Sequence, residues 1–153
     1  MVHQLTLLRR TPCVGICSTT YGDLVCRGCK RFAHEIVQWN GFTEHQRSAV
    51  SQRLAQLREG AVLSHLEIID AESLRRRALE LQLPEMTLAN LAYETLKWLS
   101  VGANVDGESD LVTLGLRALS GNPKPVVVLE AIEREFYERS VARYEHDFHT
   151  IAQ

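Results

Sequence analysis

The amino-acid sequence predicts a mainly α protein, with a small four-cysteine knuckle at its N-terminus packed on a helical bundle-like body. All four cysteines lie between residues 13 and 29, in a segment with little helical periodicity. From residue 31 onward, apolar residues recur at spacings of three and four, which is the period of an amphipathic helix. We expect residues 1–59 to form the cysteine module with two following helices, and residues 60–153 to form a helical region to which no role is assigned.

Two helices are predicted directly after the cysteines. The apolar spacing indicates a helix over residues 31–39, and an Asn-Gly pair at residues 40–41 ends it. Thr43 and Gln46, three residues apart, form a capping-box signature. They predict the start of a second helix, which runs until Gly60 caps or interrupts it.

The remaining chain also reads as helices separated by turn signals. Residues 61–83 predict one or two amphipathic helices, and residues 87–99 predict another. A short helix is expected to begin at Ser109 or Asp110. The longest periodic stretch predicts a final helix over residues 126–150. The three valines at its start also fit a short strand, but no partner strand is evident in the sequence.

Composition and charge exclude several classes of protein. Of 153 residues, 45% are hydrophobic and 24% charged, as in an ordinary globular domain. The net charge of -2 provides no general attraction to nucleic acid or to acidic membranes. No apolar run approaches the roughly 18 residues of a membrane-spanning helix, and no signal-peptide pattern is present. We therefore expect a cytoplasmic protein, in which thiols stay reduced.

The cysteines follow the spacing Cys13-x3-Cys17-x8-Cys26-x2-Cys29. Two close pairs joined by a short loop can surround one ion with four thiolates, and such clustering in a reducing compartment favours metal over disulfides. We expect Gly28 to permit the tight turn inside the second pair. Two disulfides and four unrelated buried thiols remain as alternatives.

The metal itself is left open by the spacing. Four thiolates carry a charge of about -4, so a zinc ion or a four-iron cluster would each leave about -2. Arg27, Lys30 and Arg31 lie beside the cysteines in sequence, where they can offset this charge and face a partner. The cofactor is thus expected to be one zinc ion or one iron–sulfur cluster, with a 4Fe-4S cluster favoured over a 2Fe-2S cluster.

Residues 11–57 resemble the small bacterial DUF1289 family of predicted iron–sulfur proteins. The residues that carry the resemblance are Pro12-Cys13, Gly15, Cys17, Cys26-Arg27-Gly28-Cys29, Arg31, Glu35-Ile36, Trp39, and Thr43 with Arg47. The resemblance implies a metal-binding role for the four cysteines. It does not extend to the C-terminal two-thirds of the chain.

These observations favour a non-enzymatic metal-binding protein that acts as an interaction or regulatory module, with another protein as its partner. No phosphate-binding loop, nucleophile elbow or Ser/His/Asp order is present in the sequence. One alternative is an iron–sulfur protein that carries electrons or senses oxidants.

A second alternative is a nucleic-acid-binding protein that uses the basic residues near the knuckle. The arginines that could extend such a basic strip are Arg47, Arg53, Arg58 and Arg75-Arg76-Arg77. Acidic residues are interleaved with them, which favours a solvated helix face instead. No membrane partner is expected, and the final helix could pair two copies of the chain.

Overall fold

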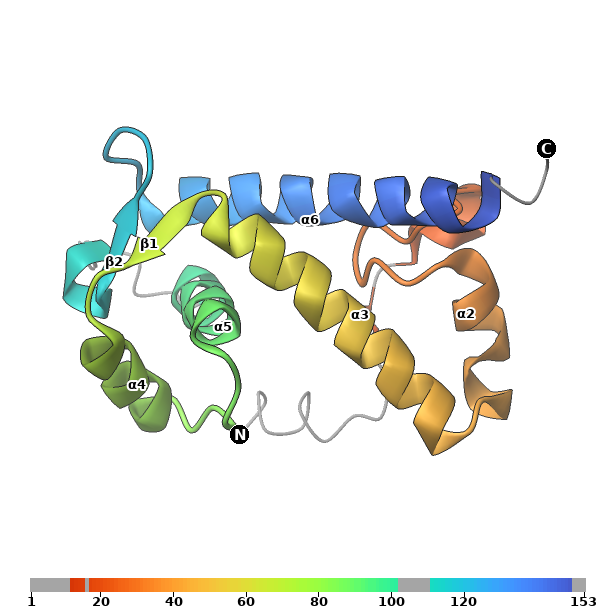
Figure 1. The fold of residues 1–153 in the computed structure, drawn as a ribbon, viewed down its shortest axis with the longest axis horizontal. Coiled ribbons are helices and arrows are strands. Elements are labelled where there is room, and N and C mark those ends of the chain that lie inside the picture. Colours follow the sequence, from red (N-terminus) through yellow and green to blue (C-terminus); the bar gives the residue numbers. More distant parts are fainter. Residues whose placement is uncertain (1–11, 16, 102–110, 150–153) are drawn as a thin grey trace. The chain divides into compact units, whose positions relative to one another are not determined.

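The computed structural model describes residues 12–15, 17–101 and 111–149, and over these residues the protein is mainly α, which confirms the predicted fold class. Figure 1 shows the elements, in which η marks a 3₁₀ helix. In chain order they are η1 (Ser18–Tyr21), α2 (Ala33–Gln38), η2 (Trp39–Gly41), α3 (Glu44–Leu63), β1 (Leu66–Ile68), α4 (Ala71–Glu80), α5 (Leu88–Val101), η3 (Leu111–Leu114), β2 (Leu116–Ala118) and α6 (Pro125–His149). None of the helices in these ranges is both long and apolar enough to cross a membrane.

The chain divides into two compact units. Residues 1–57 and 136–153 form the first, here called the cysteine unit, and residues 58–135 form the second, the central unit. The sequence suggested a division between residues 59 and 60, with all later residues in one region. In the structure, the end of the last helix, from residue 136, groups with the cysteines. Aromatic packing accounts for it, because Tyr144 and Phe148 of α6 meet the ring of Phe32 edge-on, at centroid distances of 5.1 and 5.8 Å.

The cysteine unit is organised around a buried ion pair at the start of α2. Glu35 accepts a hydrogen bond of 2.8 Å from the Phe32 backbone N–H, which satisfies a donor at the start of the helix. The same carboxylate accepts two hydrogen bonds of 2.6 Å from Arg53 on α3. The Arg53 guanidinium also lies over the Phe32 ring, 4.0 Å from its centroid. One carboxylate therefore begins α2 and joins it to α3.

The predicted capping box at the start of α3 is confirmed. The Gln46 N–H donates to the Thr43 hydroxyl at 3.1 Å, and the Thr43 N–H donates to the Gln46 side chain at 2.8 Å. The prediction that Gly60 caps or interrupts this helix is wrong, because α3 continues to Leu63. A mid-helix glycine costs about 1 kcal/mol. Complete burial of the next residues, Ala61 and Val62, offsets that cost.

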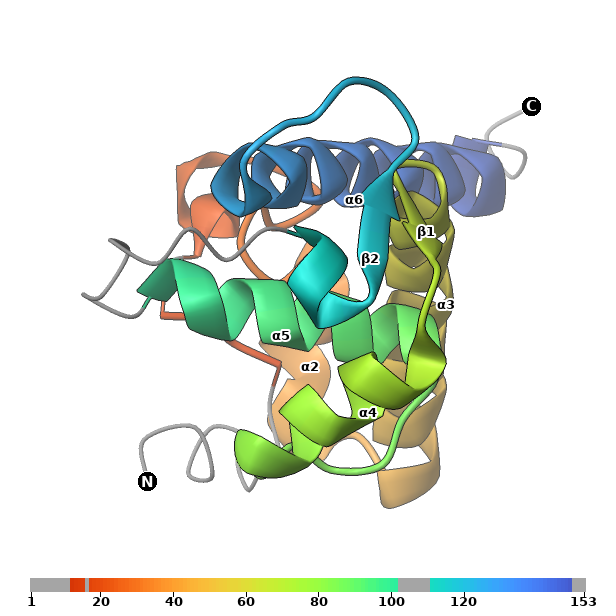
Figure 2. The same cartoon turned by 90° about the vertical axis from the view of Figure 1, so that its left-hand side faces the viewer.

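A two-stranded antiparallel sheet replaces part of the helix predicted over residues 61–83. β1 pairs with β2 in the register Leu66 with Ala118, Glu67 with Arg117 and Ile68 with Leu116; Figure 1 and Figure 2 both show these strands side by side. Leu66 and Leu116 are buried, whereas Arg117 donates to Glu67 at 2.6 Å on the exposed face. The apolar residues of β1 therefore cover one face of a half-buried strand and not one side of a helix. The partner strand lies 50 residues further along the chain, as counted from Glu67 to Arg117.

Helices α4, α5 and α6 agree with the prediction more closely. Asp70 caps α4 by accepting a hydrogen bond from the Ser73 N–H at 3.2 Å. The start of the predicted short helix at Ser109 or Asp110 lies outside the described residues, and the chain from Leu111 onward forms the 3₁₀ turn η3 and the strand β2. The valines at 126–128 belong to α6, so the strand alternative for them is wrong. The buried apolar side chains of the central unit include Leu74, Ala78, Leu91, Ala92, Leu96, Leu111, Leu114 and Ile132.

Tyr93 lies in a polar network inside the central unit. Its hydroxyl donates to Glu133 of α6. The guanidinium of Arg58 lies over its ring, 4.9 Å from the centroid, and also donates to Asn90 at 2.7 Å. Burial raises the pKa of the Tyr93 phenol well above its usual value, and the adjacent Glu133 carboxylate raises it further.

This pKa predicts a loss of stability in alkaline solution. Above about pH 10 an unfolded tyrosine releases its proton while the folded Tyr93 retains it, so unfolding becomes more favourable as the pH rises. Below that pH the contribution is complete. We expect this residue to lower the unfolding free energy by about 1.4 kcal/mol per pH unit above pH 10. Denaturant titrations at several pH values measure the slope, and Tyr93→Phe should have a shallower one. Equal slopes for the two proteins would contradict the prediction.

Candidate metal centre

The second cysteine pair lies in a tight turn closed by backbone hydrogen bonds. Val25 and Phe32 form an isolated antiparallel bridge, and the Cys26 N–H donates to the Arg31 carbonyl at 2.9 Å. The turn closes where the Lys30 N–H donates to the Cys26 carbonyl at 2.8 Å. These bonds bury Cys26 and Cys29, with Cys26 only 1% exposed.

The residue with the unusual backbone conformation in this turn is Lys30. Its φ angle is 64°, in the left-handed region, which costs a non-glycine residue roughly 1–2 kcal/mol. Gly28, which the sequence analysis expected to permit the tight turn, is not among the residues with positive φ. The closing bond between Lys30 and Cys26 therefore holds a strained residue in place.

The sulfur of Cys26 is surrounded by backbone donors. Burial raises the pKa of the Cys26 thiol, but hydrogen bonds from the backbone N–H groups of Cys29, Ser18 and Gly28 outweigh burial and lower the pKa to about 7. Burial has the larger effect at Cys29, and there it raises the pKa despite a hydrogen bond from Arg31. Within the second pair, Cys26 is thus the sulfur that its surroundings favour as a thiolate.

The first pair repeats one feature of the second. The N–H of Gly15 donates to the Cys13 sulfur at 3.4 Å, just as the N–H of Gly28 donates to the Cys26 sulfur. In both cases the donor is the glycine two residues after the cysteine, in a Cys-x-Gly sequence. Gly15 needs its lack of a side chain, because its φ is 96°.

The segment after Cys17 is attached to the second pair. The hydroxyl of Ser18 accepts a hydrogen bond of 2.8 Å from the Arg27 N–H. The Ser18 N–H also donates to the Cys26 sulfur. The Cys17 sulfur itself lies 2.8 Å from the Thr19 hydroxyl. The backbone next to Cys17 is therefore placed against the Cys26 turn.

The structure brings Cys26 and Cys29 together but does not gather all four sulfurs around one point. Among the described residues, no three Cys, His, Asp or Glu side chains lie close enough to hold a metal ion. All four cysteines are free thiols, of which Cys13 and Cys17 are half-buried. The predicted four-cysteine site thus has one assembled pair, while convergence of the other pair stays a prediction.

The three basic residues of the motif have different surroundings. Lys30 and Arg31 are buried, 3% and 4% exposed, so the expectation that they face a partner is corrected. The Lys30 ammonium donates to the Gly28 carbonyl at 3.0 Å and lies over the Phe136 ring, and Arg31 donates to the Cys29 sulfur at 3.3 Å. Only Arg27, whose side chain is 67% exposed, remains available at the surface.

The geometry does not suit a dithiol that exchanges disulfides with other proteins. In such enzymes the thiol with the lowered pKa must be reached by the partner's sulfur. Cys26 has the lowered pKa, but it is nearly inaccessible. A buried sulfur that accepts several N–H groups is instead typical of a metal ligand whose charge is stabilised by its surroundings.

Five of the six arginines that could have formed a basic strip make contacts within the chain. These contacts are Arg47 to the Trp39 carbonyl, Arg53 to Glu35, Arg58 to Asn90, Arg76 to Glu72 and Arg77 to Glu80. A guanidinium that already has an acceptor loses that bond when it turns to a phosphate. These contacts weaken the nucleic-acid alternative.

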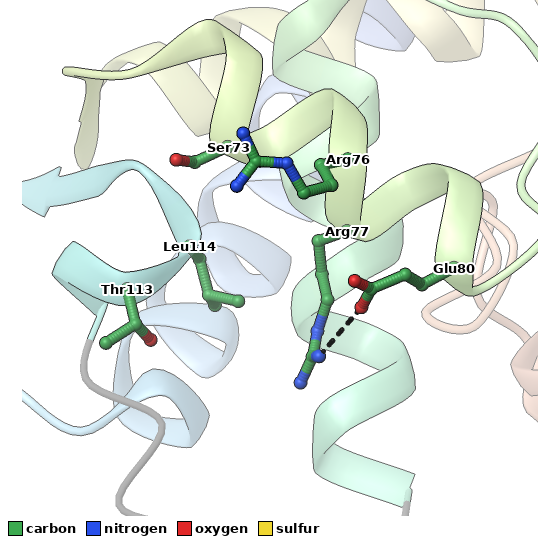
Figure 3. A pocket seen from close by; sticks show the side chains of 6 residues that line it. All are labelled: Ser73, Arg76, Arg77, Glu80, Thr113 and Leu114. Carbon is green, nitrogen blue, oxygen red and sulfur yellow. Dashed lines mark hydrogen bonds and ion pairs between the residues drawn. The ribbon is translucent and has the colours of Figure 1, made fainter.

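A hollow of about 200 Å³ opens between α4 and η3 in the central unit, and Figure 3 shows the six side chains that line it. Its lining residues are Ser73, Arg76, Arg77, Glu80, Thr113 and Leu114. Acidic partners already occupy three of its donors: Ser73 bonds to Asp70 at 2.7 Å, Arg77 to Glu80 at 3.1 Å, and Arg76 lies 4.0 Å from Glu72. The chain's own carboxylates thus satisfy the groups that would otherwise attract an anion, and we assign no ligand to this hollow.

Comparison with known proteins agrees with the resemblance seen in the residues. No curated protein and no solved structure gives a significant match to the chain. A family model described as a protein of unknown function, DUF1289, matches residues 11–58. The match covers the four cysteines, α2, η2 and most of α3, and ends close to the boundary between the two units. Over this segment, about a third of its length, the chain is similar to the DUF1289 family.

Proposed function

We propose that Cys13, Cys17, Cys26 and Cys29 hold one metal centre and that the protein works as a non-enzymatic metal-binding module for interaction or regulation. The observation that carries the proposal is the environment of the second pair. The Cys26 sulfur accepts three backbone N–H groups, and the Cys29 sulfur accepts a hydrogen bond from the buried guanidinium of Arg31. Donors directed at sulfur stabilise thiolates, which are the form that binds metal.

We infer that the first pair completes the site. Its Cys-x-Gly turn repeats the donor arrangement of the second pair, and Ser18 attaches it to Cys26. A metal ion bound to Cys26 and Cys29 would provide the attraction that draws Cys13 and Cys17 inward. Four thiolates would fill every position of a tetrahedral zinc site or supply one ligand to each iron of a four-iron cluster.

The charges near the second pair fit such a centre. With four thiolates, a zinc ion or an iron–sulfur cluster carries a net charge of about -2. Arg31, which is buried, supplies a positive charge directly beside the Cys29 sulfur, to which it donates a hydrogen bond of 3.3 Å. A buried cation is costly unless an anion compensates it, so the placement of Arg31 beside Cys29 supports an anionic centre. It does not distinguish zinc from iron.

The same features favour a structural or regulatory role over catalysis. A site with four protein ligands leaves no position open for a substrate, and closed zinc sites typically stabilise a fold. A second candidate, an iron–sulfur redox or sensor protein, is supported by the N–H donors on Cys26 and Cys29. Hydrogen bonds to sulfur are one of the means by which proteins set the potential of such clusters.

Metal analysis with a visible spectrum, on protein purified without oxygen, tests the proposal. We expect one zinc ion and no colour, or about four irons with a broad band near 400 nm, per chain. Zinc would support the structural module, and iron would support the redox candidate. Absence of both metals, together with failure to take up zinc or ferrous iron with sulfide, would overturn the proposal.

A further inference from the structure

Arg31 is a buried arginine whose side chain contacts a cysteine sulfur and an indole ring. Its Nε donates to the Cys29 sulfur at 3.3 Å, and its guanidinium lies over the Trp39 ring, 4.7 Å from the centroid. No carboxylate pairs with Arg31 among the interactions of the described residues. Arg53, also largely buried, shows the usual arrangement, because it makes a bidentate ion pair with Glu35.

A buried guanidinium without an anionic partner is unfavourable, because it has lost most of its hydration and gained no opposite charge. The stacked indole compensates only part of this loss. The side-chain hydrogen bond of Arg31 goes to the sulfur of Cys29, which is neutral as a thiol and anionic as a metal-bound cysteinate. The side chain is therefore arranged for a partner that becomes negative when the proposed centre forms.

We propose that Arg31 is the positioning residue of the metal site: it directs the Cys29 sulfur toward the centre and offsets its charge, while Trp39 holds the guanidinium in place. This inference rests on the proposed metal-binding function and deepens it. Arginine suits the task better than lysine, because its planar group can stack on the indole and donate to the sulfur at the same time.

A second arginine, Arg47, also contacts Trp39, and this supplies a matched control. The Nε of Arg47 donates to the Trp39 carbonyl at 3.1 Å, and its guanidinium lies 5.9 Å from the centre of the same ring. Arg47 thus shares the contact with Trp39 and the charge of Arg31, but it has no contact with a cysteine sulfur in the described structure. A general loss of charge or of packing should affect both residues alike.

The contact between ring and guanidinium also provides a spectroscopic signal. A change in charge at Cys29 changes the electrostatic attraction between its sulfur and the guanidinium of Arg31. The indole of Trp39 stacks on that guanidinium. We expect the emission of Trp39 to shift when metal binds. Trp98, the second tryptophan, lies in the central unit, so measurements in a Trp98→Phe background isolate the signal of Trp39.

The test compares Arg31→Gln, Arg31→Lys and Arg47→Gln in that background, with zinc or iron as the wild-type protein requires. Chelator competition measures the metal affinity, tryptophan emission measures the signal, and circular dichroism measures the helical content. We expect Arg31→Gln to bind metal 10–100-fold more weakly, as is usual when a residue that supports a ligand is lost. Arg31→Lys should be intermediate, and Arg47→Gln should stay within about threefold of wild type. The emission change should disappear only in Arg31→Gln.

Two results would overturn the inference while leaving the metal site intact. One is a wild-type affinity in Arg31→Gln, and the other is an equal loss in Arg31→Gln and Arg47→Gln. If Arg31→Gln fails to fold, Arg31→Lys decides by the same comparison with Arg47→Gln, because it keeps the positive charge. A wild-type protein that binds no metal would instead overturn the proposed function itself, and the inference with it.

Discussion

Replacing Cys26 by serine should abolish metal binding and expose the segment that carries the cysteines to proteases. Cys26 is the most buried of the four cysteines and the sulfur on which the N–H groups of Ser18, Gly28 and Cys29 converge. A serine hydroxyl is a far poorer ligand than a thiolate for zinc and for iron–sulfur clusters. Because metal binding and folding are coupled in small metal modules, loss of the ligand should also release the turn.

Elemental analysis and limited proteolysis measure the two effects. We expect the metal content to fall from one centre per chain to a trace, and new cleavage to appear within residues 12–40, while residues 58–135 stay resistant. Arg27→Ser is the matched control, because it changes the exposed neighbour of Cys26 in the same turn and should keep both metal and resistance. Unchanged cleavage in Cys26→Ser would contradict a metal-dependent fold, and so would equal cleavage in the two variants. Wild-type protein stripped of metal should behave as Cys26→Ser does.

Replacing Gly115 by alanine should destabilise the central unit severely. Gly115 has a φ of 80°, and a β-carbon added there would lie 2.2 Å from the Asp70 carbonyl oxygen. The backbone cannot easily move away, because the Ile69 and Asp70 N–H groups both donate to the Gly115 carbonyl, at 2.9 and 3.1 Å. The left-handed conformation costs alanine roughly 1–2 kcal/mol, and the clash adds to it. We expect a total loss of about 3 kcal/mol or more, a large part of the stability of a typical domain.

Gly121→Ala separates the two contributions. Gly121 also has a positive φ, 67°, but no heavy atom outside its chain neighbours lies within 4 Å of the position of its missing β-carbon. We expect a loss of only about 1 kcal/mol there. Denaturant unfolding followed by circular dichroism gives both values. Equal losses at the two glycines would show that the close approach to Asp70 contributes nothing.

The features that the sequence predicted correctly are local ones. The capping box at Thr43 and Gln46 is formed by residues three positions apart, and the helix over residues 87–99 corresponds to α5. The DUF1289 segment was also recognisable, because its cysteines and glycines succeed one another at fixed spacing. Such signals arise from chain geometry over a few residues, so they are readable without knowledge of the tertiary contacts.

Other features depend on residues far apart in the chain. Leu66 became a strand residue because Ala118 of the distant strand β2 pairs with it, and α3 continued through Gly60 because Ala61 and Val62 are buried. Within the cysteine unit, the grouping of the end of α6 with Phe32 could not be read from either segment alone.

In the candidate site, too, some features could be predicted from the sequence and others depend on the tertiary structure. By itself the sequence determined which residues are the candidate metal ligands, since the four cysteines stand close together and thiolates are the ligands that zinc and iron–sulfur clusters share. Only the tertiary structure decided which of the neighbouring cations are buried. Arg27, Lys30 and Arg31 look equivalent in sequence, but the turn buries Lys30 and Arg31 and leaves Arg27 exposed. The physical reason is that the rings of Trp39 and Phe136, which cover Arg31 and Lys30, belong to other elements, and these contacts determine whether a charged side chain is solvated or buried.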